Sequence, residues 1–443
     1  MLGGLRQLAL RALDTMSGML ATPPDGRTYH YDPTFSGMRS TLTTRINFTR
    51  INQILDAGKN GELAEAMLLY EEMEQRDARL RSVAGTRRRA LTKLDYEIVS
   101  AAEMTKAKID KTLADEVAAY TREKFDVIDG LGEALKHLAT AIGPNLAVAE
   151  IEWNPLLFEP VAVFAIPSER LTMQLLESTD VQIKTREFPR GTPCRTPKFI
   201  VHIPESTSGS PLWKSLSEAQ AWLWLIKKLA VADWGTFCEL FGMPVRIGKY
   251  RPAATAEEKT ALREMLTQMG SKAWAMVSES VDLEVVESSQ RGVSPFEAIL
   301  NFCDRQQGVL FLGGNLTSDT TGGTGTFAAA KVQDDVRDDL RDDDIACEQR
   351  TVRGQLIRPM VEFKYPGRNA PPPYFRRIKP ETIDRLREGQ VIKTAQGTGM
   401  RVPLEWAHKR LGIPKPTETD EVLEPVDAFV EGVKEVPDED ATE

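Results

Sequence analysis

The chain has 443 residues, of which 41% are hydrophobic and 27% are charged, so it is long enough for two or three compact units of ordinary folded composition. Its formal net charge is −9, yet residues 417–443 alone contain eleven acidic side chains and one lysine, which leaves the rest of the chain nearly neutral. A neutral body argues against tight, salt-sensitive DNA binding, and the lack of any long apolar run excludes a membrane span.

Helices and one strand are predicted for the N-terminal third of the chain. Residues 1–45 are rich in turn residues after a first short amphipathic helix, and from Asn47 to Arg89 the apolar residues recur at helical spacing. The stretch "ALTKLDYEIVSA" then alternates as a strand does. The following residues, up to "ATAIG", return to helical spacing in two pieces.

The pattern changes between Leu146 and Ile203, where short β-branched and aromatic runs are separated by Pro, Gly and Ser. This pattern predicts a small β-rich module. A tryptophan-rich stretch of helical spacing follows and ends in the short basic strand "FGMPVRIGKY". Beyond it we expect a helix from Ala254 to Gly270, strands in "AWAMVSES" and "VDLEVVES", and a helix from Pro295 to Gln307.

A Gly- and Thr-rich stretch, "GNLTSDTTGGTGT", predicts a flexible loop before a long helix. The helix starts at Phe327 and, at 1.5 Å per residue, reaches about 50 Å before Pro359 marks its predicted end. A helix this long with so narrow an apolar stripe is expected to pack along neighbouring elements. Helices near Pro380–Glu388 and Pro403–Leu411 precede a Pro- and acid-rich tail, which is predicted to be disordered.

The most enzyme-like pattern lies on the long helix. Asp334–Asp338 and Asp338–Asp342 both fit the DDxxD motif with which prenyl-diphosphate enzymes hold magnesium, and carboxylates at this spacing share a helix face. However, the two copies overlap on one helix, and Arg337 and Arg341 lie at ion-pairing distance in sequence. A solvated, salt-bridged face is therefore favoured, and a magnesium-dependent all-α enzyme is the alternative.

Other catalytic or cofactor motifs are absent from the sequence. The Gly/Thr loop lacks the order of a phosphate-binding loop. His202, within an apolar strand, has no Cys or acidic partner at ligand spacing and reads as a core residue, and His30, His137 and His408 are isolated. The four cysteines read as reduced, mostly buried thiols. The sequence therefore predicts no enzyme, no cofactor and no metal site.

One basic cluster is a candidate contact to nucleic acid. Arg87, Arg88 and Arg89 end a predicted helix, with Lys93 close behind. Such a cluster is as typical of a helix C-terminus, where cations offset the helix dipole, as of a nucleic-acid patch. A monomeric DNA-binding adaptor is accordingly a further hypothesis.

Three stretches together carry a family resemblance. "MEQRDARLRSVAGTRRRALTKLDYEI" leads from a helix into a strand, "DWGTFCELFGMPVRIGKY" closes the tryptophan-rich segment, and "LGGNLTSDTTGGTGTFAAAKVQDDVRDDLRDDD" joins the loop to the long helix. In this order, over roughly residues 40–365, the chain resembles the portal proteins of phage Mu and its relatives.

The resemblance implies an α+β subunit of elongated, multi-part build, with an α/β wing, a helical stem, a small α/β clip, a long helix with a tunnel loop and a crown-like C-terminal part. Such subunits form a homo-oligomeric ring, usually of twelve copies, at one capsid vertex of the virion, and the ring is assembled in the bacterial cytoplasm. The ring passes double-stranded DNA non-specifically during packaging and ejection. Its implied partners are the terminase large subunit, the major capsid or scaffold protein, and head-completion or connector proteins, with no membrane partner and no cofactor.

The resemblance also implies a division of the chain. The expected parts are a partly disordered N-terminal arm (1–39), the first part of the wing (40–149), the clip and stem (150–240), the second part of the wing (241–312), the tunnel-type loop and long helix (313–360), the crown-like part (361–414) and an acidic disordered tail (415–443).

Two sets of site residues follow from this division. The small, hydroxyl-bearing loop would touch DNA without gripping it, because each added Lys or Arg strengthens binding through counterion release; its residues are Gly314, Asn315, Thr317, Ser318, Asp319, Thr320 and Thr321. Large aromatics on more than one side of a helix suit a subunit that packs on its own fold and on a neighbour; the inter-subunit packing candidates are Trp213, Trp222, Trp224 and Trp234.

Overall fold

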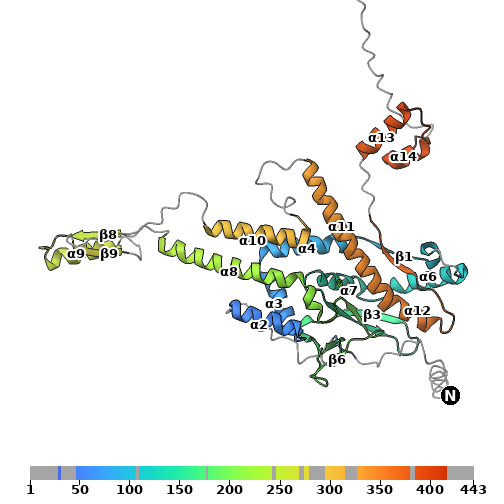
Figure 1. The fold of residues 1–443 in the computed structure, drawn as a ribbon, viewed down its shortest axis with the longest axis horizontal. Helices are drawn as coiled ribbons and strands as arrows, with labels where there is room; N and C mark the ends of the chain where they lie inside the picture. The colour runs from blue at the N-terminus through green and yellow to red at the C-terminus, as the bar shows by residue number, and fades with distance from the viewer. Residues whose placement is uncertain are drawn as a thin grey trace, which may run out of the picture. The chain divides into compact units, whose positions relative to one another are not determined.

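A computed structural model describes residues 28–30, 46–105, 109–175, 178–241, 246–268, 274–278, 295–314, 327–379 and 385–416. The described chain is mixed α+β, mostly helical with small sheets, as the sequence predicted at this level (Figure 1). It divides into a body, Met1–Ile378, and a smaller C-terminal unit, Lys379–Glu443, which are described separately.

Helices make up most of the described body. In chain order they are α2 (Phe48–Lys59), α3 (Leu63–Arg76), α4 (Ala78–Thr92), α5 (Ala101–Met104), α6 (Lys111–Phe125), α7 (Leu131–Leu138), α8 (Leu216–Phe241), α9 (Ala256–Gln268), α10 (Pro295–Leu312), α11 (Phe327–Val352) and α12 (Arg358–Lys364). Several begin where the sequence offers a capping side chain: Asn47, Asp77 and Asp110 accept hydrogen bonds from first-turn N–H groups of α2, α4 and α6. The predicted helical region from Asn47 to Arg89 is thus confirmed as three helices.

The described strands form four small sheets. They are β1 (Tyr96–Val99), β2 (Ala147–Trp153), β3 (Pro160–Ala165), β4 (Leu171–Met173), β5 (Val181–Ile183), β6 (Thr192–Pro193), β7 (Phe199–His202), β8 (Arg246–Tyr250), β9 (Trp274–Ser278) and β10 (Tyr374–Arg377). The sheets are the antiparallel sets β3-β2-β7, β4-β5-β6 and β1-β10, and the parallel pair β8-β9. Strands β2 to β7 confirm the predicted β-rich module.

The β-rich module is built into the two large cores of the body. Along β2, Val148 faces a core shared with α2, α3, α4, the start of α8 and the end of α10. Its neighbours Ala149 and Ile151 face a second core, shared with α6, α7, α12, β1 and β10. This period of two is what a strand covered on both faces requires. The sheet β3-β2-β7 therefore separates and joins the two cores.

The long helix continues past its predicted end. α11 runs into a π-helical turn, Arg353–Ile357, and directly into α12, so the prediction that Pro359 ends the helix was wrong. Pro359 lies in the first turn of α12, and the wider π turn before it loosens the regular hydrogen-bond ladder that a proline would otherwise disrupt. Likewise, α10 extends beyond the predicted end at Gln307 through the apolar residues up to Leu312.

Within its described residues, the C-terminal unit contains α13 (Arg385–Gly397) and α14 (Leu404–Leu411). The second matches its predicted position. The first is described from Arg385, because residues 380–384 lie outside the described residues, and it extends to Gly397, past the predicted end at Glu388.

A buried ion pair fastens β10 to α11. The Arg377 guanidinium donates two hydrogen bonds to the Glu348 carboxylate at 2.6 and 2.7 Å and a third to the carbonyl oxygen of Leu94 at 2.7 Å. Both side chains are almost fully buried, at 4% and 2% exposure. The adjacent Arg376 instead pairs with Glu97 at the surface, where the two side chains are 54% and 43% exposed.

We predict that Arg377→Ala lowers the free energy of unfolding by about 3–5 kcal/mol, because it leaves the Glu348 charge buried without a partner. Arg376→Ala is the matched control, and its loss should stay below about 1 kcal/mol, as for exposed ion pairs. Urea denaturation followed by circular dichroism measures both, and equal losses in the two variants would contradict the prediction.

Candidate functional site

Helices α8 and α10 form an antiparallel pair, and among the described residues the other helices of the body cover one end of it (Figure 1). Lys227 meets Asp304 toward the body, and Phe237 contacts Phe296 farther along, with ring centroids 5.8 Å apart. The N-terminal half of α8 is part of the first core, where Trp224 and Leu225 are 4% and 0% exposed. Figure 1 shows the two helices side by side, with the later half of α8 and the start of α10 beyond the body's other helices.

A polar clamp joins this pair to α4. The Asp77 carboxylate caps α4 and also accepts hydrogen bonds from Lys227 Nζ of α8 at 2.9 Å and from Gln307 Nε2 of α10 at 2.8 Å. Lys227 Nζ also lies 2.6 Å from the carboxylate of Asp304. We refer to Asp77, Lys227, Asp304 and Gln307 as the clamp.

The clamp shifts the titration of its members. Burial alone would raise the pKa of Asp77, but the hydrogen bonds from Lys227, Gln307 and the Leu80 N–H outweigh it and lower that pKa below its ordinary value. Burial would likewise lower the pKa of Lys227, and the bonds to Asp304 and Asp77 reverse the effect and raise it. Both charged forms are therefore favoured at neutral pH.

Beyond the clamp, the pair exposes large apolar side chains. Residues 231–239 of α8 are all exposed. The exposed apolar set, which we call the outer apolar residues, is Val231 (50%), Trp234 (38%), Phe237 (36%), Ile299 (40%) and Phe302 (51%). Exposed apolar side chains gathered on one helix pair mark an interaction surface rather than the scattered exposure of an ordinary surface.

The four predicted packing tryptophans are in different environments. Trp234 belongs to the outer apolar residues, and Trp213 is 59% exposed with Lys59 Nζ 5.0 Å from its ring. Trp222 is half-buried and stacks on Phe48. Trp224 lies in the subunit's own core instead, because the N-terminal half of α8 turns that side toward α3.

The sequence did not single out Phe237, Ile299 and Phe302 as surface residues. Their signal was the apolar character that α8 and α10 keep beyond the length covered by the core, and only the positions of the other helices reveal that length.

Between α8 and α10 the chain forms a small unit of its own. β8 and β9 pair in parallel with α9 between them in sequence, which makes a βαβ unit. Leu262 and Leu266 of α9 lie against Gly248 of β8, where a side chain would clash with them. Leu266 is only 4% exposed, so α9 packs on the strand pair.

The segment around the predicted channel loop is described only at its borders. Gly314 is the last described residue before the loop, and Asn315, Thr317, Ser318, Asp319, Thr320 and Thr321 lie outside the described residues. On α11, Arg337 pairs with Asp334 at 3.0 Å and Arg341 with Asp338 at 2.8 Å. The predicted salt-bridged face is confirmed, and within the described residues no group of three or more His, Cys, Asp or Glu side chains is arranged to hold a metal ion.

Two of the three clustered arginines are held inside the chain. Arg87 binds Asp344 of α11 with two hydrogen bonds, at 2.8 and 2.9 Å, and both side chains are largely buried. Arg88 forms an ion pair with Glu74 of α3. Their charges are thus used to join α4 to α11 and α3, which weakens the interpretation of Arg87, Arg88 and Arg89 as a DNA contact.

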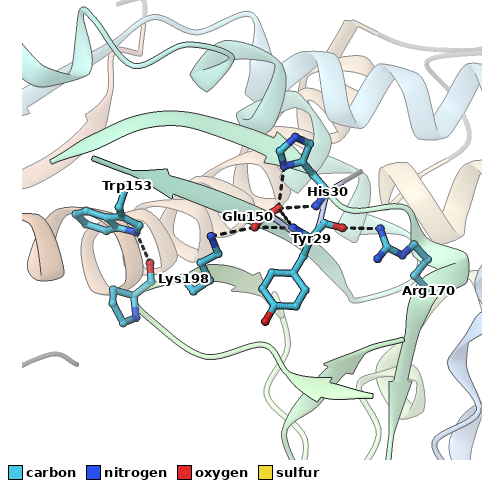
Figure 2. Close-up of polar contacts among 7 residues, drawn as sticks. Tyr29, His30, Glu150, Trp153, Arg170 and Lys198 are labelled. Carbon is cyan, nitrogen blue, oxygen red and sulfur yellow. Dashed lines mark hydrogen bonds and ion pairs between the residues drawn. The ribbon is translucent and has the colours of Figure 1, made fainter. Parts of the chain in front are cut away.

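Part of the predicted N-terminal arm is also held by the body, as Figure 2 shows. The buried carboxylate of Glu150, on β2, accepts hydrogen bonds from the Tyr29 N–H and His30 Nδ1 at 2.9 Å and pairs with Lys198 Nζ at 3.1 Å. Arg170 donates to the Tyr29 carbonyl oxygen, and the His30 ring stacks on Phe164. The only signal for this contact in the sequence is a pair of glutamates, Glu150 and Glu152, within an otherwise apolar strand.

The remaining candidate groups are structural. His202 is 3% exposed, and burial together with the nearby Arg350 lowers its pKa to about 4, so it is a neutral core residue as predicted. All four cysteines are free; Cys194, Cys303 and Cys347 are buried and Cys238 is exposed. Among the described helices, none is both long and apolar enough to cross a membrane.

A sequence profile for the family described as "Portal protein of Mu bacteriophage" matches residues 67–413. The chain belongs to this family. The Mu-like prophage FluMu protein gp29 of Haemophilus influenzae is 26% identical over 412 residues, which cover 89% of this chain and 74% of that protein. The portal protein of Escherichia phage Mu is 25% identical over 381 residues, which cover 84% and 72%.

A solved structure shares the fold of this portal subunit. A chain in the virion of a native gene transfer agent particle aligns with a TM-score of 0.51 at 10% identity, covering 84% of the present chain and 100% of that one. Family membership makes the protein a phage portal protein, a structural component of the virion and not an enzyme, as predicted. The magnesium-dependent enzyme is thereby excluded.

We predict that Asp77→Asn lowers the free energy of unfolding of the portal subunit by about 1.5–3 kcal/mol at pH 7, because asparagine still caps α4 but loses the charge that binds Lys227. The pKa of Asp77 is lower in the folded state than the unfolded value of 3.8, so its charge stabilises the fold fully above pH 3.8. This stabilisation is lost as the pH falls through the folded pKa. The difference from the wild type should therefore shrink toward pH 3.

Thermal unfolding at pH values from 7 to 3 tests this, with Asp110→Asn as the control. Asp110 caps α6 at an exposed position and accepts only from the Leu113 N–H among its described contacts. Its replacement should change stability by less than about 0.5 kcal/mol. A loss at Asp77 that does not vary with pH would disprove the charge argument.

Proposed function

We propose that this portal subunit assembles into a ring, of twelve copies as the family resemblance implies, at one capsid vertex of the virion, where the ring is the conduit for double-stranded DNA during packaging and ejection. The observation that carries the proposal is the set of outer apolar residues on α8 and α10, exposed in a chain of the portal family. In a closed ring each copy contacts two neighbours through different surfaces, so helices that leave the body have apolar sides to cover.

We assign the stem to α8 and α10 and the clip to the unit of β8, α9 and β9. The support is topological, because the chain leaves the body along α8, forms the small βαβ unit and returns along α10. This assignment differs from the sequence-based division, which placed the clip and stem at residues 150–240 and part of the wing at 241–312. The sheet β3-β2-β7 suits the wing better, since it lies between the two cores of the body.

We assign the channel wall to the Gly/Thr loop and the start of α11. The loop is free of Lys and Arg from Gly313 to Ala330, and α11 then presents Asp334, Asp338 and Asp342 at exposures of 58%, 51% and 43%. The arginines of this face, Arg337 and Arg341, are already paired with these carboxylates, so phosphates gain little counterion-release affinity and DNA would slide along the surface without being held.

The proposed partners follow from the same division. The terminase large subunit and the head-completion or connector proteins would dock on the ring from outside the capsid, and the major capsid or scaffold protein would surround it at the vertex. The ring would form in the bacterial cytoplasm before it becomes part of the virion. The unit Lys379–Glu443 would take the place of the crown.

We predict that Trp234→Asp combined with Phe237→Asp prevents ring assembly. Burying each side chain is worth about 1.5–3 kcal/mol, so association across one interface should weaken by more than about a hundredfold. Size-exclusion chromatography with light scattering distinguishes rings from monomers. Thr236→Asp is the matched control: it adds a charge to the same exposed turn without removing an apolar side chain, and should still form rings. Rings formed equally by both variants would refute the stem assignment.

We also predict that deletion of residues 315–324 leaves ring assembly intact but reduces DNA packaging or retention, because the loop touches the moving DNA and not a neighbouring core. Negative-stain imaging reads out the rings, and nuclease-protected DNA per particle reads out packaging. A variant with the same stretch replaced by an equal length of Gly and Ser should retain more packaging than the deletion. Loss of the rings in the deletion variant would instead make the loop a structural element.

A further inference from the structure

We propose that residues 425–436 of the acidic tail dock as an amphipathic helix on the α13–α14 pair of the same chain and complete the C-terminal unit. The inference does not depend on the portal function. It is carried by the exposed surface and charge of α13 and α14 and by the residue pattern of the tail.

The α13–α14 pair exposes far more apolar surface than it buries. Within its described residues, Ile392 is the one large apolar side chain that is buried, at 8% exposure. The exposed ones are Val391 (53%), Met400 (67%), Leu404 (68%), Trp406 (47%) and Ile413 (54%). Two short helices are too small to enclose a hydrophobic core between them, so we expect another segment to pack on this apolar surface.

The pair is nevertheless a defined scaffold. Arg410 of α14 donates to the Glu388 carboxylate of α13 at 2.9 Å, and Leu411 of α14 lies near Gly389 of α13. α14 ends at Gly412 in the left-handed conformation, with the Ile413 N–H bonded back to the His408 carbonyl at 3.0 Å. The tail thus starts just after a well-defined helix end.

The charges of the pair and the tail are complementary. Residues 385–416 contain seven Lys or Arg and two Glu, whereas residues 417–443 contain eleven acidic residues and one Lys. Lys393, Arg401, Lys409 and Lys415 are exposed. Opposite net charges on two consecutive segments of one chain attract each other, and the attraction is screened by salt.

The tail carries an apolar stripe at helical spacing. Val426, Phe429, Val430 and Val433 follow the pattern i, i+3, i+4 and i+7, which places them on one face of a helix. Pro425 stands where the first turn of that helix would be, a position that tolerates proline. Gly432 weakens the helix by about 1 kcal/mol, so the segment needs a surface to pack on.

The connection is long enough for the segment to fold back on its own chain. Eight residues, 417–424, separate the described unit from Pro425 and can span up to about 28 Å. The thirteen residues of α13 make a helix about 20 Å long. The tail can therefore reach any part of the pair without help from a second copy.

Hydrogen–deuterium exchange of the full-length protein, read by mass spectrometry, tests the proposal. In the double variant Phe429→Ser with Val430→Ser, amides of residues 385–413 should lose about tenfold or more in protection, since two buried apolar side chains are removed. The control, Ala428→Ser with Gly432→Ser, changes two positions off the apolar stripe and should retain wild-type protection. Peptides from α4 should be unaffected in both.

A second measurement separates the tail from other covers. In a chain ending at Pro416, addition of a synthetic peptide of residues 420–440 should restore the protection of α13 and α14, and the same peptide carrying both serine substitutions should not. Unchanged protection in the Phe429→Ser, Val430→Ser variant would overturn the proposal. A loss of protection when the wild type is diluted would also overturn it, because a second copy would then be the partner of α13 and α14. Protection that appears only with double-stranded DNA would overturn it as well.

Discussion

Helix α4 is the point to which the functional elements of this subunit are fastened, and the Asp77 carboxylate is the central contact. It caps α4 and at the same time binds Lys227 of α8 and Gln307 of α10. A single buried carboxylate thus sets where the antiparallel pair starts and which parts of α8 and α10 lie outside the body. Ten residues further along α4, Arg87 binds Asp344 and so ties α11 to the same helix.

Several buried charges in the described body form ion pairs. Glu348 is neutralised by Arg377, and Glu150 by Lys198, while two residues of the N-terminal arm donate hydrogen bonds to Glu150. A protein in which hydrophobic residues replace a buried ion pair is often as stable as the original. However, the two charges of a buried pair meet in only one arrangement of the elements that carry them. We expect these pairs to act in this portal subunit mainly by selecting the arrangement, so that helices far apart in sequence meet in one register.

α8 combines two environments in one helix. Its first half is a core helix, with Ala221, Trp224 and Leu225 inside, and its second half is as apolar but exposed. In a monomeric protein this surface would promote aggregation, because exposed aromatic side chains favour association. For a family of ring-forming virion proteins it is a reasonable division, since the body supplies the stability of the fold and the outer half remains available for neighbours.

The sequence by itself determined the local elements, the salt-bridged face of α11, the core role of His202 and the family, because helical and strand periodicity, i,i+3 ion-pair spacing and motif order are all local along the chain. It did not predict that the helix passes Pro359, that Trp224 points inward, or that Tyr29 and His30 are bound by Glu150. The last two depend on partners distant in sequence, namely the helices against α8 and strand β2, whereas the first depends on the π turn directly before Pro359. Which apolar residues become core and which become surface was decided only by the tertiary structure, since burial depends on what other elements cover and not on the residue itself.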